Sequence, residues 1–182
     1  IVSICIGSVL ANIVVIDRNL IKRELLVEKY GVLVSQSTKD SLLNTDIIVL
    51  AIKPQHMADL IIDIRDIVVD KQLIITVAAG IEISLYENLF NKDVAIARVM
   101  PNTPSSLGFG ASGVFFTSLV GDMQKQFVVS MLMSMGIVEV VAKESDINII
   151  AACSGSGTAY YLQFMEHMVN SSVSRGLSKK QA

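Results

Sequence analysis

The amino-acid sequence predicts an α/β protein in which a doubly wound parallel sheet is followed by the start of an all-helical region. Short runs of apolar, β-branched residues alternate with segments of helical period along most of the chain. The strand-like runs are continuously apolar, which is typical of parallel strands covered on both faces. From Glu144 onward only helical periodicity is present. We therefore expect two domains, residues 1–143 and residues 144–182, with the second one truncated.

The apolar runs predict strands at residues 13–16, 32–34, 46–52, 73–77, 94–99, 108–116 and 137–141. Helical period predicts helices at residues 20–30, 38–44, 55–68, 84–90 and 122–135. We expect Gly31 to end the first helix, because glycine readily adopts the left-handed conformation found at helix C-termini. Ser84, with Glu87 three residues later, forms a capping-box pattern. We interpret residues 1–10 as the remnant of a crossover helix; a strand at residues 1–6 is the alternative.

Beyond Glu144, helices are expected at residues 146–153 and 159–175. Ser154, Gly155, Ser156 and Gly157 lie between them, and we expect this cluster to end one helix and start the next. Amide groups at a helix N-terminus lie at the positive end of the helix dipole and can bind a carboxylate or a phosphate. A tight turn between two helices, with glycines for steric reasons, explains the same residues equally well.

Composition and charge exclude several classes of protein. The 182 residues are 52% apolar and carry 15 Lys and Arg against 17 Asp and Glu, with no basic stripe, so nucleic acid is not an expected partner. The longest apolar runs, such as residues 47–52, are far shorter than the roughly 20 residues that span a bilayer, so we expect no membrane span. Two cysteines form no disulfide framework, which favours a reduced, cytoplasmic location. The chain starts at Ile1, and we expect it to be a fragment.

In an open parallel sheet a ligand lies beyond the carboxyl ends of the strands. The residues that follow the predicted strands there are Asp17-Arg18-Asn19, Ala51-Ile52-Lys53-Pro54, Val77-Ala78-Ala79-Gly80 and Met100-Pro101-Asn102. An Asp at such a position can accept a hydrogen bond from a ribose hydroxyl, and Arg18 can bind a 2′-phosphate. A solvated turn explains Asp17 and Arg18 equally well. A glycine-rich turn after the first strand, which a Rossmann-type fold requires, is missing.

Four segments together resemble the pyrroline-5-carboxylate reductase family. They are Ala51 to Gln55, Ala78-Ala79-Gly80, Arg98-Val99-Met100-Pro101-Asn102-Thr103-Pro104 and Ala152-Cys153-Ser154-Gly155-Ser156-Gly157-Thr158-Ala159-Tyr160, in family order over almost the whole chain. Each segment by itself is weak evidence for the family, but four segments at the family's spacing are specific evidence for it. Thr158 and Ser105 depart from the family pattern, the N-terminal glycine loop is absent, and so is a later glycine-rich segment near the substrate.

The resemblance implies a Rossmann-type domain, a helical dimerisation domain, and reduction of 1-pyrroline-5-carboxylate to L-proline in proline biosynthesis. It implies NADPH as the cofactor, with NADH possible, and a homo-oligomer made of a dimer or several dimers. Ala51, Ile52, Lys53, Pro54, Val77, Ala78, Ala79 and Asn102 would line the dinucleotide, with Asp17, Arg18 and Asn19 at its adenosine end. Glu144 and residues Ser154, Gly155, Ser156 and Gly157 would border the substrate.

Two other classes of function share parts of this pattern. A dehydrogenase of the β-hydroxyacid type would have a similar βα pattern but should carry a catalytic lysine in its helical domain. A non-catalytic dinucleotide-binding module would share even more. Neither His56 nor His167 has a cysteine or a second histidine nearby in the sequence, so we expect no metal site. The residues do not single out a general acid.

Overall fold

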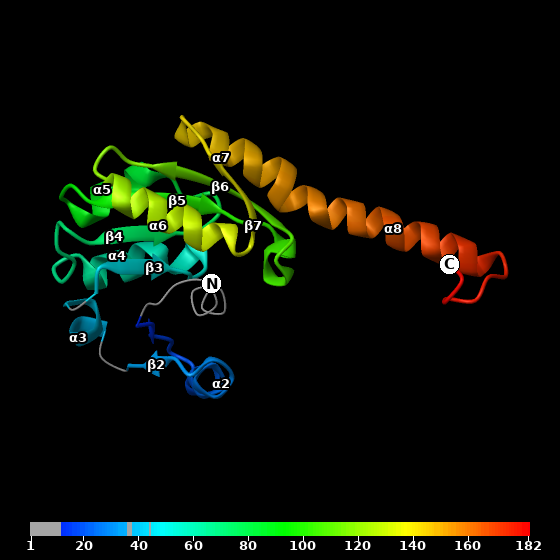
Figure 1. The fold of residues 1–182 in the computed structure, drawn as a ribbon, viewed down its shortest axis with the longest axis horizontal. Coiled ribbons are helices and arrows are strands. Elements are labelled where there is room, and N and C mark those ends of the chain that lie inside the picture. Colours follow the sequence, from blue (N-terminus) through cyan, green and yellow to red (C-terminus); the bar gives the residue numbers. More distant parts are fainter. Residues whose placement is uncertain (1–11, 36–37, 44) are drawn as a thin grey trace.

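The computed structural model of the chain describes residues 12–35, 38–43 and 45–182 (Figure 1). A five-stranded sheet has the order β3-β4-β5-β6-β7, and β1 and β2 form a separate parallel pair. The strands are β1 (Val14–Val15), β2 (Leu33–Val34), β3 (Ile47–Leu50), β4 (Leu73–Thr76), β5 (Ala95–Met100), β6 (Gly110–Phe116) and β7 (Gly136–Val140). The helices are α2 (Leu20–Tyr30), α3 (Thr38–Leu43), α4 (Met57–Ile64), α5 (Ile83–Phe90), α6 (Asp122–Met133), α7 (Glu144–Ile150) and α8 (Ser156–Ser174). Short 3₁₀ helices, η1 (Pro54–His56) and η2 (Thr103–Leu107), precede α4 and β6.

The predicted α/β class is confirmed. All neighbouring strands of the five-stranded sheet run parallel except β5 and β6, which are antiparallel. The predicted strands and helices of residues 13–141 are all present, with ends that differ by a few residues. The expectations for residues 1–10 lie outside the described residues.

Alternate residues of β4 and β5 supply two separate cores. Leu73, Ile75, Ala97 and Val99 face α6, where they pack against buried side chains such as Leu132. Ile74 and Ile96 belong to the second core, and half of its other buried members come from α4 and α5. Figure 1 shows α6 on one side of the sheet, as this two-sided burial requires. Both faces of β4 and β5 are therefore covered, which explains why these two strands are apolar at nearly every position.

Local sequence sets the ends of α2. The Asn19 side chain accepts a hydrogen bond from the Lys22 N–H at 3.1 Å, which makes it the N-cap of this helix. Gly31 follows the last turn with φ of 63°, and its N–H donates to the Val27 carbonyl. The prediction that Gly31 ends this helix is confirmed, because that φ is unfavourable for a residue with a Cβ.

The N-terminus of α5 differs from the prediction. The helix begins at Ile83, so Ser84 lies inside it, and the predicted Ser84 cap is wrong. The Ile83 N–H instead donates to Oε1 of Glu144 at 2.7 Å, 61 residues further along the chain. A carboxylate suits this position because it satisfies an amide left unpaired at the helix start and lies at the positive end of the helix dipole.

The C-terminal region is helical, but it does not break where we expected. α7 continues through a π-helical turn, η3 (Ala151–Gly155), directly into α8. Gly155 has φ −66° and ψ −52°, and Ser156 has φ −89° and ψ −34°, so both are right-handed helical. The expectation that Ser154 to Gly157 ends one helix and starts another is wrong, because one extra residue in a wide turn is accommodated without leaving helical backbone geometry.

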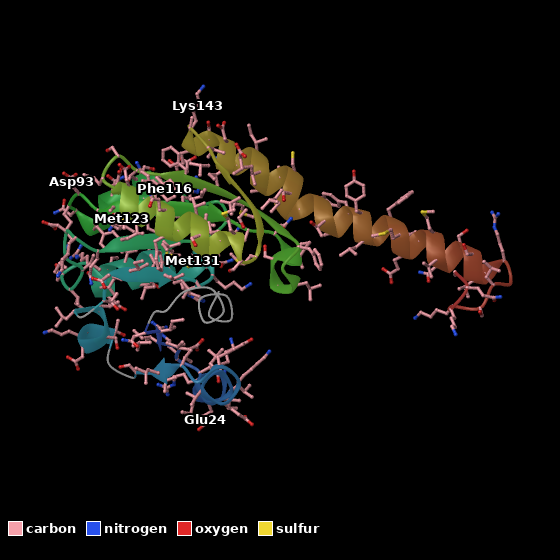
Figure 2. All side chains as sticks on the ribbon, viewed as in Figure 1. Glu24, Asp93, Phe116, Met123, Met131 and Lys143 are labelled. Carbon is pink, nitrogen blue, oxygen red and sulfur yellow. The ribbon has the colours of Figure 1, made fainter. Side chains whose placement is uncertain are left out.

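α8 extends away from the sheet (Figure 1), and Figure 2 shows its side chains pointing outward along its length. None of its residues is buried in the described chain, although it is rich in large apolar side chains. Tyr161 is 73% exposed and Phe164 is 63% exposed. Within the described residues, no helix combines the length and the apolar character needed to cross a membrane.

Candidate functional site

The carboxyl ends of β3, β4 and β5 lie at one edge of the sheet, because these three strands are parallel and adjacent. Ala51, Ile52 and Lys53 follow β3 and are exposed. After β4, Ala78 is buried whereas Ala79 and Gly80 are exposed. Small exposed residues at strand ends let a ligand approach the backbone closely. The structure thus brings the predicted segments after β3, β4 and β5 to the same edge.

Asp17, Arg18 and Asn19 lie between β1 and α2, at the end of the two-stranded pair. Oδ1 of Asp17 accepts a hydrogen bond from the Asn19 N–H at 2.8 Å, and the Asn19 side chain caps α2. These two side chains therefore shape the turn that starts α2. Arg18 is exposed. A guanidinium exposed at such a strand end has access to a ligand phosphate.

Asn102 joins the end of β5 to the helical region. Its Oδ1 accepts from the Ala111 N–H at 2.9 Å, and its Nδ2 donates to Oγ of Ser154 at 3.0 Å. The second contact brings a predicted cofactor residue and a predicted substrate residue into direct hydrogen bonding. It crosses from the sheet to the π-helical turn, 52 residues further along the chain.

The π-helical turn brings the Ser-Gly cluster close to β5. A Cβ at Gly155 would lie 2.7 Å from Cε of Met100, whereas a Cβ at Gly157 would meet no atom of the described residues within 4 Å, apart from its chain neighbours and the adjacent helix backbone. The Ser156 N–H donates within the helix, to the carbonyls of Ala151 and Cys153. The cluster is therefore not a helix N-terminus with unpaired amides, and the predicted amide cradle is not present in that form. The segment instead carries two serine hydroxyl groups and two glycines, which have no side chain to obstruct a ligand.

Arg98 and Glu144 form an ion pair next to this region. Nη1 of Arg98 lies 2.6 Å from Oε1 of Glu144, and Nη2 donates to Oδ1 of Asn148 at 2.8 Å. The Arg98 side chain is 2% exposed and that of Glu144 is 27% exposed. A guanidinium buried this deeply requires an anionic partner, because its desolvation is costly. We predicted Glu144 as a substrate-bordering residue; its Oε1 also accepts from Arg98 and Ile83 within this chain.

Thr76 and Tyr86 add a buried hydroxyl pair. Thr76 lies opposite Arg98 in the β4–β5 pairing, and its Oγ1 is 2.6 Å from the Tyr86 hydroxyl oxygen. The Ala78 N–H donates to the same Oγ1 at 3.3 Å. Burial raises the pKa of Tyr86 above its usual 10.0, although the hydrogen bond with Thr76 and the charge of Arg98 oppose this rise. Tyr86 is therefore a neutral hydrogen-bonding group at neutral pH.

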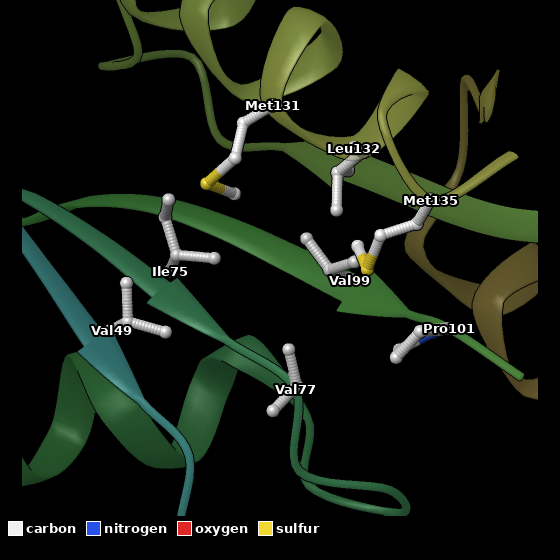
Figure 3. A pocket seen from close by; sticks show the side chains of 8 residues that line it. All are labelled: Val49, Ile75, Val77, Val99, Pro101, Met131, Leu132 and Met135. Carbon is white, nitrogen blue, oxygen red and sulfur yellow. The ribbon is translucent and has the colours of Figure 1, made fainter. Parts of the chain in front are cut away.

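A small apolar cavity lies between the sheet and α6 (Figure 3). Its volume is about 10 Å³, and it is lined by Val49, Ile75, Val77, Val99, Pro101, Met131, Leu132 and Met135. It is far smaller than the several hundred Å³ of a typical ligand pocket, and its lining offers no polar side chain. We therefore interpret it as a packing defect of the core. Among the residues that the structure describes, no group of three or more His, Cys, Asp or Glu side chains could hold a metal ion.

Comparison with known proteins decides the family. A family model described as "Pyrroline-5-carboxylate reductase dimerisation" matches residues 144–182, and one described as "NADP oxidoreductase coenzyme F420-dependent" matches residues 3–80. The structure of a pyrroline-5-carboxylate reductase from Coxiella burnetii superposes with a TM-score of 0.90 at 36% identity, covering 99% of this chain and 68% of that one. The chain belongs to the pyrroline-5-carboxylate reductase family.

Other pyrroline-5-carboxylate reductases are also similar. The enzyme of Vibrio alginolyticus is 35% identical over 157 residues, which cover 86% of this chain and 58% of that protein. The pyrroline carboxylate reductase of Plasmodium falciparum, solved with NADP bound, has a TM-score of 0.86 at 25% identity and covers 99% of this chain and 66% of that one. The chain spans about 58% of the length of the first curated relatives that it matches. The family resemblance drawn from the four sequence segments is confirmed.

Several residues near the candidate site were not identified from the sequence. Thr76, Tyr86 and Asn148 were given no role, and Arg98 was noted only as part of a motif. A charged Arg98 inside an otherwise apolar strand was the signal that could have pointed to a buried anion. The partner itself, Glu144, lies 46 residues away, so only the fold shows the pairing.

Proposed function

We propose that the full-length protein reduces 1-pyrroline-5-carboxylate to L-proline with a reduced nicotinamide dinucleotide, as an oxidoreductase of proline biosynthesis. Family membership supports this proposal. The single observation that carries it is the Asn102–Ser154 hydrogen bond, which holds the end of β5 against the π-helical turn. A hydride donor bound at the strand ends and a substrate bound at that turn would then be neighbours, which is the proximity that hydride transfer requires.

The sheet edge fits a dinucleotide. Three parallel strand ends meet there, and the small exposed residues Ala51, Ala79 and Gly80 leave their backbone open to a ligand. We propose that residues 51–54, residues 77–79 and Asn102 line the cofactor, and that Asp17, Arg18 and Asn19 meet its adenosine end. The exposed Arg18 favours NADPH over NADH, because a guanidinium can pair with the additional phosphate. The Plasmodium falciparum relative, which was solved with NADP, supports the same choice.

The residues of this chain orient the reactants in the proposed mechanism. NADPH, when bound, would supply the hydride for the imine carbon of the substrate ring. The ring nitrogen is or becomes protonated, so the reaction needs no strong acid from the protein, and we name no general acid. Oγ of Ser154 accepts from Asn102, and its own O–H remains able to donate to a substrate carboxylate. We propose that Glu144, Ser154, Gly155, Ser156 and Gly157 border the substrate.

We also propose that the chain divides near residue 143 and that α8 belongs to a dimer or a multiple of dimers. The dimerisation family model begins at Glu144, which supports this boundary. The exposed apolar side chains along α8 support burial against a second chain. The proposed partners are a small-molecule substrate and a second copy of the protein, without nucleic acid or membrane, and the proposed location is the cytoplasm, where its reduced cofactor would be available.

A spectrophotometric assay of the full-length protein distinguishes this function from the two other classes, a β-hydroxyacid dehydrogenase and a non-catalytic dinucleotide-binding module. The loss of NADPH absorbance is followed with pyrroline-5-carboxylate. In parallel, the gain of NADPH absorbance is followed with NADP+ and a panel of β-hydroxyacids. We expect turnover with pyrroline-5-carboxylate alone. Turnover of a hydroxyacid instead would assign the second class of dehydrogenase, and NADPH binding without any turnover would assign a non-catalytic module.

A further inference from the structure

Glu144 connects three elements through a single oxygen atom. It is the first residue of α7, and its Oε1 accepts from Nη1 of Arg98 on β5 at 2.6 Å and from the N–H of Ile83 at the start of α5 at 2.7 Å. Both contacts reach from the helical region back to the sheet domain. The carboxylate therefore bridges the two parts of the chain at the place where α5 begins.

α5 depends on this contact because its own sequence supplies no cap. Glu82 occupies the N-cap position and makes no side-chain cap bond within the described chain, and Ser84 lies inside the helix. The first amides of a helix lack partners within the helix, and an acceptor provided by a neighbouring element can replace a cap. Glu144 provides that acceptor together with a negative charge at the positive end of α5.

Arg98 fixes Glu144 in turn. The guanidinium is buried, and it binds Glu144 and Asn148, which are separated by one turn of α7. The two contacts hold α7 over β5. Tight packing supports the same placement, because a Cβ at Gly113 on the adjacent strand β6 would clash with Cδ1 of Ile150 on α7.

The loop between β4 and α5 is held at both ends by this network. At its beginning, the Ala78 N–H donates to Oγ1 of Thr76, which is hydrogen-bonded to the hydroxyl of Tyr86. At its end, the Ile83 N–H donates to Glu144. Residues 77–82 are thus anchored on one side by the sheet domain and on the other by a residue of the helical region.

We propose that Glu144 is a positioning residue for the cofactor: by capping α5 it holds residues 77–82 in the conformation that binds the dinucleotide. This inference rests on the proposed function, which places the cofactor against that loop. It deepens that function by making cofactor affinity depend on the docking of α7. Because α7 leads directly into the π-helical turn with Ser154, the same residue ties the geometry of the substrate segment to that of the cofactor loop.

The test uses the full-length protein with Glu144→Ala and Glu144→Gln, and with Asp146→Asn as the matched control. Asp146 contributes a carboxylate to the same first turn of α7. Glu144→Gln keeps a neutral acceptor for Ile83 and serves as the variant that retains the shape of the site. Three quantities are measured: the Kd of NADPH without substrate, the KM of pyrroline-5-carboxylate at saturating NADPH, and amide hydrogen exchange across residues 77–86.

We expect Glu144→Ala to weaken NADPH binding about fivefold to tenfold, which corresponds to the loss of a good helix cap. The change in the logarithm of the NADPH Kd should be about half as large for Glu144→Gln, because this variant keeps the acceptor and loses only the charge. Exchange should accelerate in residues 77–86 and remain slow in β5. Asp146→Asn should leave all three quantities at their wild-type values.

Two results would overturn the proposal while the wild-type enzyme behaves as proposed. One is a higher KM for pyrroline-5-carboxylate with an unchanged NADPH Kd, which would make Glu144 a direct substrate ligand. The other is a lower melting temperature with unchanged NADPH affinity per folded molecule, which would make its role purely structural. Failure of the proposed function appears differently: the wild type would bind NADPH without reducing pyrroline-5-carboxylate, and the NADPH Kd values of the variants would still decide the role of Glu144.

Discussion

Replacing Asn102 with alanine tests whether this side chain holds the sheet and the helical region together. The substitution removes the acceptor of the Ala111 N–H and the donor to Ser154 Oγ, with donor–acceptor distances of 2.9 and 3.0 Å. Asn102 and Ala111 are half-buried, so water can partly replace the lost partners. The loss in the free energy of unfolding should therefore be smaller than the loss for a fully buried amide.

The expected magnitude follows from these two contacts. A hydrogen bond of this kind contributes about 1 kcal/mol net, and an amide left without an acceptor costs about 1–3 kcal/mol when buried. We expect Asn102→Ala to lower the free energy of unfolding by about 2 kcal/mol. Ser154→Ala removes only the second contact and should cost about 1 kcal/mol.

Urea unfolding of the full-length protein measures these differences. All variants are compared at one protein concentration, because the stability of an oligomer depends on it. Asn88→Ala is the control, since Asn88 is an exposed asparagine on α5. It should stay within about 0.5 kcal/mol of the wild type. The double variant Asn102→Ala with Ser154→Ala should show a coupling of about 1 kcal/mol.

Additive effects of the two substitutions would refute the reasoning, since the Asn102–Ser154 bond would then contribute nothing. If Asn102→Ala lowers the free energy of unfolding no more than Asn88→Ala does, the contact with Ala111 would also contribute nothing. In either case the proximity of the strand end and the π-helical turn, on which the proposed function rests, would need another cause.

Three further predictions concern other residues. Tyr86 holds its proton more tightly in the folded state than in the unfolded state, so the stability it contributes is present below pH 10 and is lost as the pH rises above that value; the free energy of unfolding should fall more steeply above pH 10 for the wild type than for Tyr86→Phe, and equal slopes would contradict this. Gly157→Val should raise the KM for pyrroline-5-carboxylate without weakening NADPH binding, because the new side chain would narrow the proposed substrate site, whereas its Cβ would meet no atom of the described residues beyond its own helix. A lower thermal midpoint with normal kinetics per folded molecule would instead assign the glycine to packing between chains. Arg18→Ala should reduce the preference for NADPH over NADH by about 1–2 kcal/mol, as measured by the ratio of kcat/KM values, and an unchanged ratio would remove Arg18 from the site.

The sequence by itself determined the α/β class and the positions of most elements. Continuous apolar runs such as Leu73 to Ile75 predict buried parallel strands, because both faces of such a strand must be covered. Gly31 ends α2 through a backbone conformation that depends on that one residue. The four family segments indicated which strand ends and which helical turn to examine. These features depend on short stretches of chain, so reading along the sequence was sufficient.

Only the tertiary structure decided the helix starts and the contacts between the two parts of the chain. A capping preference is worth only about 1 kcal/mol. The packing of α7 places the Glu144 carboxylate at the start of α5, where it accepts from Ile83, and Ser84 does not cap the helix. The cluster from Ser154 to Gly157 remained helical because a π turn continues the helix across it. Asn102–Ser154 and Arg98–Glu144 join residues that are 52 and 46 positions apart. No local pattern encodes such pairs, because they arise when β5 and α7 are brought together by the burial of apolar surface elsewhere in the fold.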